Sequence, residues 1–336
     1  MFTTVKKDDL HKLATDILVK CGETAENAEI IYDNLIEDEY QGKRGHGFYR
    51  LPQITRAYSN GTVITPVEVM RDGNKVEVKG NKNIGLVAMN KAVDAVIDAA
   101  KDERIVVASV YGYQNTTGAI GYYARKLARA GLVAMVAVTC DVSVAPHGSM
   151  EPHLATNPIA FAFPAGNNPV VTDVATSASP YGYIALQHKN GLPVPLGHVL
   201  DRNGNDTTDP ADAVNMLGVQ LPLAGHKGYS LGLAFELLAG VFIGVKSGTK
   251  TNGYGDDGAL IIAMRPDTFI SKGQFDENMA LFIDEIKNAK PRPDMTVRLP
   301  GMYDEEKYDA MVNSDEFEIM SEVYKDLLAL KEKLGA

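Results

Sequence analysis

The sequence predicts a mixed α/β or α+β fold, and two features of its apolar pattern support this prediction. Apolar residues recur at helical spacing in the first 40 residues, whereas later segments alternate between helical spacing and a period of two. Two of the period-two stretches are hairpin-like, so we do not expect a purely parallel sheet. With 336 residues, the chain is long enough for about two domains.

The N-terminal region is expected to be helical. A first helix over 8–21 ends at Gly22, because glycine commonly terminates helices. Thr24 can cap a second helix that reaches Tyr40. A third, short helix over 52–59 begins with proline, which is favoured at the first helical position.

The remaining elements alternate between the two patterns. Residues 67–78 predict a hairpin in which Asp72-Gly73 forms a primed turn. After it we expect helices at 88–101, 118–130, 176–187, 227–244, 275–288 and 315–333. Strands are expected at 105–110, 132–139, 158–163, 169–174 and 259–264.

Composition narrows the class of protein. The chain is 45% hydrophobic and has a net charge of −10, which argues against an extended nucleic-acid surface. Its two cysteines, Cys21 and Cys140, are too few for a disulfide framework or a structural zinc site. The most apolar stretch, 231–245, contains Glu236 and three glycines, so we expect a buried core helix and no membrane segment. We therefore expect a cytoplasmic protein.

Two motifs could mislead. Residues 253–258 spell G-x-G-x-x-G, but a polar loop precedes them, a strand follows, and Asp256 and Asp257 would repel a phosphate. Residues 228–232 spell G-x-S-x-G, but no histidine follows His226 to serve as the base of a hydrolase. We expect a surface loop at the first motif and small residues on a packed helix at the second.

A metal site is not expected. His147, Glu151 and His153 could ligate a metal only if their loop folded back on itself, and their spacing matches no rigid metal-binding motif.

His46 and Arg50 are the strongest candidates for chemistry. Histidine is the natural proton donor near neutral pH, and the glycines on both sides leave the ring of His46 accessible. If 46–50 is helical, Arg50 shares a face with His46 and can hold a carboxylate beside it. Taken alone, the pair would be interpreted by default as a capped helix start with a surface histidine.

Three further segments could bind a ligand. Gly225-His226-Lys227-Gly228 opens the long apolar helix, where free N–H groups and a lysine make an anion site. Thr156-Asn157-Pro158 and the segment 173–177 place short polar side chains at strand edges. Each of these signals is weak by itself.

Taken in order, six segments resemble those of the malate/L-lactate dehydrogenase type 2 family, and the similarity covers nearly the whole chain. The segments are Gly42-Lys43-Arg44-Gly45-His46-Gly47, Ala155-Thr156-Asn157-Pro158, Asp173-Val174-Ala175-Thr176-Ser177, Asp206-Thr207-Thr208-Asp209-Pro210, Leu221 through Tyr229, and Arg298-Leu299-Pro300-Gly301. The family includes L-sulfolactate dehydrogenase, ureidoglycolate dehydrogenase, 2,3-diketo-L-gulonate reductase and piperideine-2-carboxylate reductase.

The resemblance implies a non-Rossmann fold, in which a mixed β-sheet flanked by helices binds NADH or NADPH. It implies a mostly helical domain formed by 1–75 with 276–336, which makes substrate and dimer contacts, and a cofactor-binding domain over 76–275. The expected partners are a small carboxylate substrate and a second copy of the chain, with no nucleic acid and no membrane.

The implied activity is NAD(P)H-dependent reduction of a small 2-oxo acid. His46 falls on the proposed proton donor of the family, and Arg50 falls on the arginine that binds the substrate carboxylate. Cofactor contacts are implied at Ser143, Asn157, Pro158, Asp173, Val174, Ala175, Thr176, Ser177, His226, Lys227 and Gly301.

The chain departs from the family pattern at several positions. Gly45 replaces the usual serine before the active-site histidine, and Thr116 stands where a second histidine is often found. Tyr183 lies where the family has a basic residue, which favours NADH over NADPH because the 2′-phosphate needs a positive partner.

Two alternative functions stay open. The same hydride geometry would serve the C=N bond of a cyclic imino acid. A non-catalytic nucleotide-binding homologue would bind cofactor without turnover, and Gly45 and Thr116 motivate this alternative. The sequence does not name the substrate.

Overall fold

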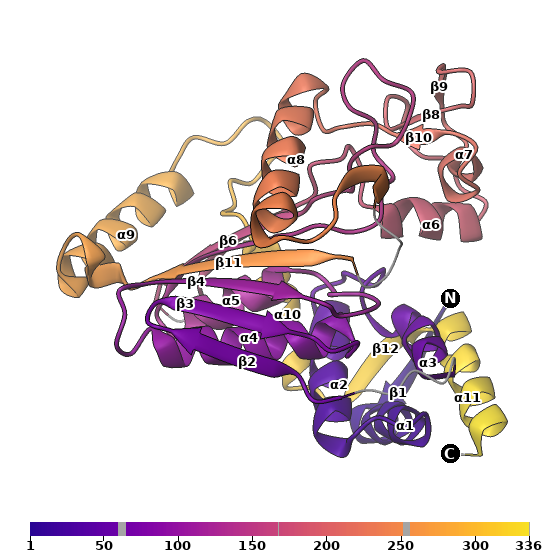
Figure 1. Cartoon of the computed structure of the whole chain (residues 1–336), viewed down its shortest axis with the longest axis horizontal. Coiled ribbons are helices and arrows are strands. Elements are labelled where there is room, and N and C mark those ends of the chain that lie inside the picture. Colours follow the sequence, from indigo (N-terminus) through magenta and orange to yellow (C-terminus); the bar gives the residue numbers. More distant parts are fainter. Residues whose placement is uncertain (60–64, 167, 251–255, 336) are drawn as a thin grey trace.

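The computed structural model describes residues 1–59, 65–166, 168–250 and 256–335, and a seven-stranded sheet lies at its centre (Figure 1). The strand order is β2-β3-β4-β11-β5-β6-β7. Their bounds are Glu68–Asp72 (β2), Lys75–Lys79 (β3), Ile105–Tyr111 (β4), Gly258–Met264 (β11), Val133–Val138 (β5), Ile159–Phe163 (β6) and Val170–Val174 (β7). Only β3 and β4 pair in parallel, so the predicted mixed sheet is confirmed.

The strand directions bring several chain ends to one edge of the sheet. β11 is antiparallel to both β4 and β5, and β6 is antiparallel to both β5 and β7. The carboxyl ends of β4, β5 and β7 therefore meet the amino ends of β11 and β6 at the same edge. Loops at such an edge are free to carry functional side chains, because the strands hold them without depending on them for packing.

Helices cover both faces of this sheet (Figure 1). One face packs against α4 (Gly85–Ala99) and α5 (Gly121–Arg129), and the other packs against α8 (His226–Ala239). Burial alternates along β4, with every second residue buried, as expected for a strand whose two faces meet different environments. Valine and alanine dominate the core under α4 and α5, whereas Phe235 of α8 packs with Leu260 of β11 on the opposite face.

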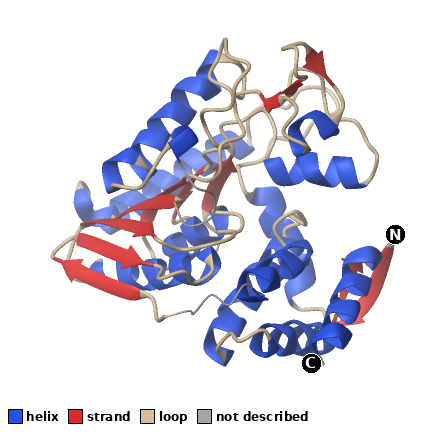
Figure 2. Ribbon diagram, turned by 45° about the vertical axis from the view of Figure 1, so that its right-hand side comes forward, coloured by secondary structure: helices blue, strands red, loops and turns tan. Residues whose placement is uncertain are grey.

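The two termini share a second core. Helices α1 (Lys7–Lys20), α2 (Ala25–Tyr40), α3 (Leu51–Ser59) and α11 (Ser321–Leu334) pack together around residues such as Leu10, Leu35 and Leu327. The strand β1 (Phe2–Lys6) pairs antiparallel with β12 (Glu316–Met320), which places both termini on the same part of the molecule (Figure 2).

The remaining elements lie at the periphery. A three-stranded sheet of β10 (Val219–Gln220), β8 (Val199–Leu200) and β9 (Asp206–Thr207) packs near α6 (Tyr181–Lys189) and α7 (Pro210–Val214). Helix α9 (Lys272–Lys287) has no buried residue and lies at the edge of the molecule (Figure 1), while α10 (Met302–Val312) packs on α2. Short 3-10 helices form at Phe48–Arg50 (η1), Val241–Ile243 (η2), Gly248–Lys250 (η3) and Pro266–Thr268 (η4).

Several sequence predictions need correction. The predicted helix at 315–333 is wrong at its start, because residues 316–320 form β12 with alternating burial, and α11 begins only at Ser321. The predicted helix at 227–244 ends at Ala239, since Gly240 leaves the helical conformation. The helix expected from 176 begins at Tyr181, after Pro180 caps it. The hairpin is confirmed, and Gly73 has a φ of +58° in its turn. Strand β1 and helix α10 escaped prediction.

Among the described residues, no helix combines the length and apolar character needed to cross a bilayer.

Candidate active site

The main cavity lies over the sheet edge where the carboxyl ends of β4, β5 and β7 meet. It has a volume of ≈ 700 Å³ and is bordered by the loop 42–50 and by α6. Of the residues that sequence reasoning selected as catalytic or as cofactor contacts, six line it: His46, Arg50, Ser143, Pro158, Asp173 and Ala175. They come from four separate segments of the chain, so the fold assembles them.

Tight packing fixes the loop that carries His46. The backbone N–H of His46 donates to the carbonyl of Lys43 at 2.8 Å. A Cβ atom at Gly47 would lie 2.4 Å from Oε1 of Glu39, which itself accepts from the backbone N–H of Phe48 at 3.0 Å. Only glycine fits at position 47, because any side chain would displace this buried carboxyl group. Burial also raises the pKa of Glu39 to about 7.

His46 is held as a neutral ring. Its Nδ1 is buried and has no hydrogen-bond partner. Burial lowers the pKa of His46 to about 4, the positive charge of Arg50 acts in the same direction, and the carboxylate of Asp173 partly opposes them. An imidazole with a free nitrogen in a cavity can exchange a proton with a bound ligand.

Arg50 lies beside His46, although 46–50 is not one helix. Residues 48–50 form η1, and the guanidinium of Arg50 donates from Nε to the carbonyl of Gly45 at 2.7 Å and from Nη1 to Gln53 at 2.9 Å. A Cβ at Gly182 of α6 would lie 3.1 Å from Nη2 of Arg50, so this glycine leaves room for the guanidinium. The side chain is thus held in the wall of the cavity, where it can bind a carboxylate.

Sequence reasoning missed Lys43, which connects three parts of the site. Its Nζ lies 3.1 Å from Oδ2 of Asp173 on β7 and 3.3 Å from Oδ2 of Asp304 on α10. The same oxygen of Asp173 accepts from the backbone N–H of Gly121 at 3.1 Å. Burial alone would lower the pKa of Lys43, but these carboxylates together with Asp38 raise it. Lys43 therefore stays charged next to His46.

Other residues implied as cofactor contacts lie outside the cavity wall. Asn157 is buried and donates to the carbonyl of Gly232 and to Glu236 of α8. Thr176 and Ser177 are also buried, and their hydroxyls donate to backbone carbonyls. The other members of this group are Val174, His226 and Lys227, which are exposed, and Gly301, which packs against the backbone of Val171.

The G-x-S-x-G motif lies inside α8, where its glycines serve packing. A Cβ at Gly228 would lie 2.5 Å from the carbonyl oxygen of Thr176, and one at Gly232 would lie 2.9 Å from its Oγ1. Ser230 is exposed and donates to the carbonyl of His226. The expected packed helix with small residues is confirmed, and these glycines hold the segment 173–177 against α8.

Two motifs remain, the G-x-G-x-x-G pattern at 253–258 and the group of His147, Glu151 and His153. Residues 253–255 of the G-x-G-x-x-G motif lie outside the described residues, and β11 begins at its last glycine, Gly258. His153 lies 3.6 Å from Glu151 at the exposed surface. Within the described ranges, no three His, Cys, Asp or Glu side chains gather as metal ligands.

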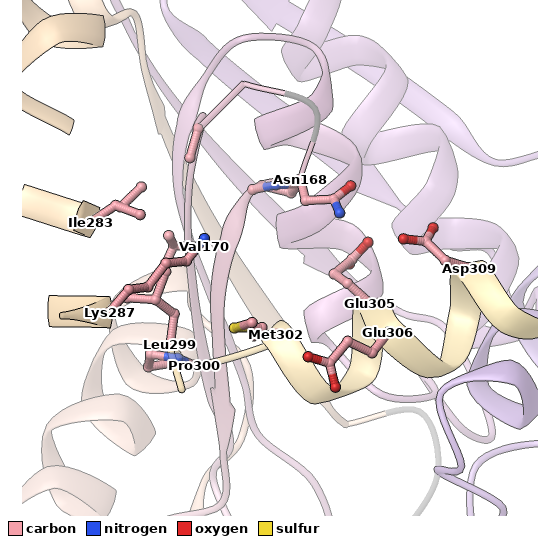
Figure 3. A pocket seen from close by; sticks show the side chains of 12 residues that line it. Asn168, Val170, Ile283, Lys287, Leu299, Pro300, Met302, Glu305, Glu306 and Asp309 are labelled. Carbon is pink, nitrogen blue, oxygen red and sulfur yellow. The ribbon is translucent and has the colours of Figure 1, made fainter. Parts of the chain in front are cut away.

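A smaller pocket of ≈ 240 Å³ lies between β7, α9 and α10 (Figure 3). It combines apolar side chains with carboxylates: Val170, Ile283, Leu299, Pro300 and Met302 beside Glu305, Glu306 and Asp309. It shares no lining residue with the main cavity. Glu305 is already paired with Arg125, so its carboxylate is not available in this pocket as a free acid or base.

Comparisons with known proteins show the family to which the chain belongs. The family model for malate/L-lactate dehydrogenase matches residues 5–328. L-sulfolactate dehydrogenase of Methanocaldococcus jannaschii is 31% identical over 98% of this chain and 97% of its own length. Ureidoglycolate dehydrogenase (NAD(+)) of Escherichia coli O157:H7 is 27% identical over 97% of this chain and 95% of its own length.

Solved structures give the same result. Sulfolactate dehydrogenase from Methanocaldococcus jannaschii superposes with a TM-score of 0.88 at 30% identity, covering 99% of this chain and 98% of the other. Delta1-piperideine-2-carboxylate reductase from Pseudomonas syringae pvar. tomato superposes with a TM-score of 0.85 at 26% identity, covering 98% and 99%. The likeness therefore extends over the whole chain.

Proposed function

Because this chain belongs to the malate/L-lactate dehydrogenase family, and is therefore an NAD(P)-dependent oxidoreductase, we propose that it reduces a small 2-oxo acid to the 2-hydroxy acid. The observation that carries the proposal is that His46 and Arg50 line one cavity, with Nδ1 of His46 buried and unpartnered among the described residues. One group can bind a carboxylate and the other can hold a proton beside it.

The residues present fit a nicotinamide dinucleotide. A cavity of ≈ 700 Å³ is large enough for the reacting end of the cofactor together with a small acid. The exposed His226 and Lys227 open α8 next to the 173–177 segment, where an anionic part of the dinucleotide would meet a positive helix end. When bound, the nicotinamide supplies the hydride for C2 of the substrate.

In this mechanism, Arg50 binds the substrate carboxylate and so fixes the position of C2 and its oxygen. His46 donates its proton to that oxygen as negative charge develops on it, and takes the proton back in the reverse direction. The 3.1 Å ion pair between Lys43 and Asp173 places one positive and one negative charge next to His46, and these two charges offset each other. Orientation by Arg50 provides much of the acceleration, because it removes the entropy cost of alignment.

Absorbance at 340 nm tests the proposal, with NADH or NADPH and a panel of oxo acids. We expect turnover of at least one acid and a fall in kcat of about 10²-fold or more for His46→Ala, with cofactor affinity unchanged. His153→Ala, an exposed histidine outside the cavity, is the matched control. If the cofactor binds but no acid turns over, the substrate lies outside the panel or the chain is a non-catalytic nucleotide-binding homologue.

A second candidate substrate is a cyclic imino acid. His46 has a pKa lowered to about 4 by burial and by Arg50, so it is largely neutral at pH 7. A protonated C=N bond needs no proton from the enzyme on reduction, which suits a neutral histidine. An amine product in place of a hydroxy acid would identify this branch, and kcat for the imine would then survive His46→Ala.

We further propose NADH as the preferred cofactor, because Tyr183 lines the cavity where the family pattern has a basic residue. Initial rates with each cofactor test this preference.

The free thiols of Cys21 and Cys140 support a cytoplasmic location, where thiols stay reduced. The shared core of α1, α2, α3 and α11 supports treating 1–75 with 276–336 as one mostly helical domain beside a cofactor domain over 76–275, except that β2 at 68–72 pairs with β3 and so belongs to the central sheet.

A homodimer is the assembly we propose. Large apolar side chains are exposed on α8 and η2, including Leu237 and Phe242, and on α9, including Leu281 and Phe282. Phe242 is 73% exposed and Phe282 is 60% exposed, which is unusual for a monomer surface. Light scattering during gel filtration would give the mass of two chains, and Phe242→Asp or Phe282→Asp would yield monomer. A wild-type monomer at micromolar concentration would reject the dimer.

A further inference from the structure

Three neighbouring strands bring a second group of polar side chains into the main cavity. Tyr113 follows β4, Asp141 follows β5, and Asp257 directly precedes β11, which lies between those two strands. All three residues line the cavity that also contains His46 and Arg50. We call these three residues the acidic wall. The activity assigned so far uses none of them.

Two atoms of the acidic wall lack partners although they are buried. Tyr113 is 0% exposed and its hydroxyl makes no hydrogen bond, and Asp257 is 4% exposed with Oδ1 unpartnered. Buried polar groups are normally satisfied, since leaving one unpaired costs about 1–3 kcal/mol. Because both residues face the cavity, a ligand that fills it can supply the missing partners.

Electrostatics indicate the chemistry of that ligand. Burial, together with the carboxylates of Asp141, Asp256 and Glu236, raises the pKa of Asp257 to about 8. Burial also raises the pKa of Asp141. The carboxylates of Asp141 and Asp257 repel each other in a region shielded from water, and a bound cation would stabilise both. The hydroxyl of Tyr113 beside them can accept a hydrogen bond from that cation.

Position separates the acidic wall from the carboxylate-binding end. Asp257 adjoins β11 and Asp141 adjoins β5, whereas the His46 end adjoins Asp173 on β7, two to three strand positions away. At about 4.8 Å per strand, the two ends lie about 10–14 Å apart. One end therefore suits an anion and the other a cation, which matches a single elongated molecule with opposite charges at its two ends.

We propose that the acidic wall binds the positively charged distal group, an ammonium or guanidinium, of a 2-oxo acid whose carboxylate is held by Arg50. This inference rests on the proposed reductase function and narrows its substrate class. Asp257 and Asp141 pair with the cation, and Tyr113 accepts one of its N–H groups. An acid of similar length whose distal end is uncharged or negative leaves the polar groups of the acidic wall without a partner.

The test compares three oxo acids that differ in the charge of their distal end. This end is positive in 5-guanidino-2-oxopentanoate, uncharged in 2-oxohexanoate and negative in 2-oxoadipate. We expect kcat/KM for the guanidino acid to exceed that for 2-oxohexanoate by about 10-fold or more, since a desolvated charge pair is worth that much. We expect 2-oxoadipate to be the poorest of the three. Equal values for the guanidino acid and 2-oxohexanoate would overturn the proposal.

Substitutions of the two aspartates test whether the preference for the guanidino acid arises at the acidic wall. Asp257→Asn and Asp141→Asn should each lower the ratio of the two kcat/KM values, and the double variant should bring it within about twofold of unity. Asp276→Asn is the matched control, because Asp276 is an exposed carboxylate of α9 that pairs with Lys272 and does not line the cavity. A preference that persists in the double variant would overturn the assignment. Asp141 is only partly buried, so its variant remains informative if Asp257→Asn fails to fold.

A binding measurement separates this inference from the reductase proposal. Calorimetry with the NADH complex compares 5-guanidino-2-hydroxypentanoate with 2-hydroxyhexanoate, and neither can react with reduced cofactor. Tighter binding of the guanidino acid to the wild type, lost in the double variant, supports the acidic wall even if no oxo acid turns over. Equal binding overturns it even if the enzyme reduces other oxo acids.

Discussion

The proton affinity of His46 gives the sharpest quantitative prediction. Burial and the charge of Arg50 lower the pKa of His46 from 6.5 to about 4. That difference corresponds to about 3 kcal/mol against protonation. At pH 7, about one His46 in a thousand carries the proton. Reduction of an oxo acid needs the protonated ring, whereas oxidation of the hydroxy acid needs the neutral ring, so the two directions should respond oppositely to pH.

The assay is a pH profile of kcat/KM in both directions with the cofactor saturating. For reduction, kcat/KM should fall about tenfold for each pH unit above 5, because it follows the protonated fraction of His46. For oxidation, His46 should impose no loss between pH 6 and pH 9. Cofactor binding buries the ring further, which acts in the same direction as the burial already present.

Lys43→Met provides a variant that moves the profile in a known direction. It removes a positive charge that lowers the pKa of His46 and frees the carboxylate of Asp173, which raises it. Both effects should raise the pKa of His46, and with it the midpoint of the pH profile of kcat/KM, by about 1 pH unit or more. A reduction rate that is flat from pH 5 to pH 8, or a Lys43→Met profile that moves downward, would refute this reasoning.

Three further predictions concern stability. Arg125→Met should lower the unfolding free energy by about 3–5 kcal/mol in urea titrations, because Arg125 is 0% exposed and its loss removes an ion pair from both Glu37 and Glu305, leaving Glu305 only its contact with Arg129; a loss below about 1 kcal/mol would contradict the buried ion pair. Gly228→Ala should cost about 1–3 kcal/mol, since its Cβ would lie within 2.5 Å of backbone atoms, and an unchanged melting temperature would argue against that packing. Gly45→Ser should change stability by less than about 0.5 kcal/mol, because a Cβ there lies 3.7 Å from Gly182; a marked loss would show the loop to be tighter.

Sequence patterns predicted the elements that are strongly periodic. The hairpin at 67–78, the central strands and α8 carry long apolar repeats and were predicted in nearly the right places. Strand β12 is predicted as helix, because its five residues run directly into α11 and its partner β1 lies more than 300 residues away. Its alternation of glutamate with Phe317 and Ile319 is too short to outweigh the helical pattern that follows, so tertiary pairing with β1 decides the conformation.

The candidate site shows the same limit. His46 and Arg50 could be selected because a glycine-flanked histidine and an arginine stand close together in sequence. Lys43, Asp141 and Asp257 could not, since each is an ordinary charged loop residue until the sheet brings the strand ends together. Asn157 and Thr176 were expected at the ligand, and the structure gives them buried hydrogen bonds to α8 and to neighbouring carbonyls.

The most direct test of the central claim follows the hydride itself. The enzyme is incubated with NADH that carries deuterium at both C4 positions and with the best oxo acid of the panel, and the product is analysed by mass spectrometry and NMR. The account predicts deuterium at C2 of a 2-hydroxy acid, with formation slowed about 10²-fold in His46→Ala. A product without deuterium at C2, or an undiminished rate in His46→Ala, would contradict it.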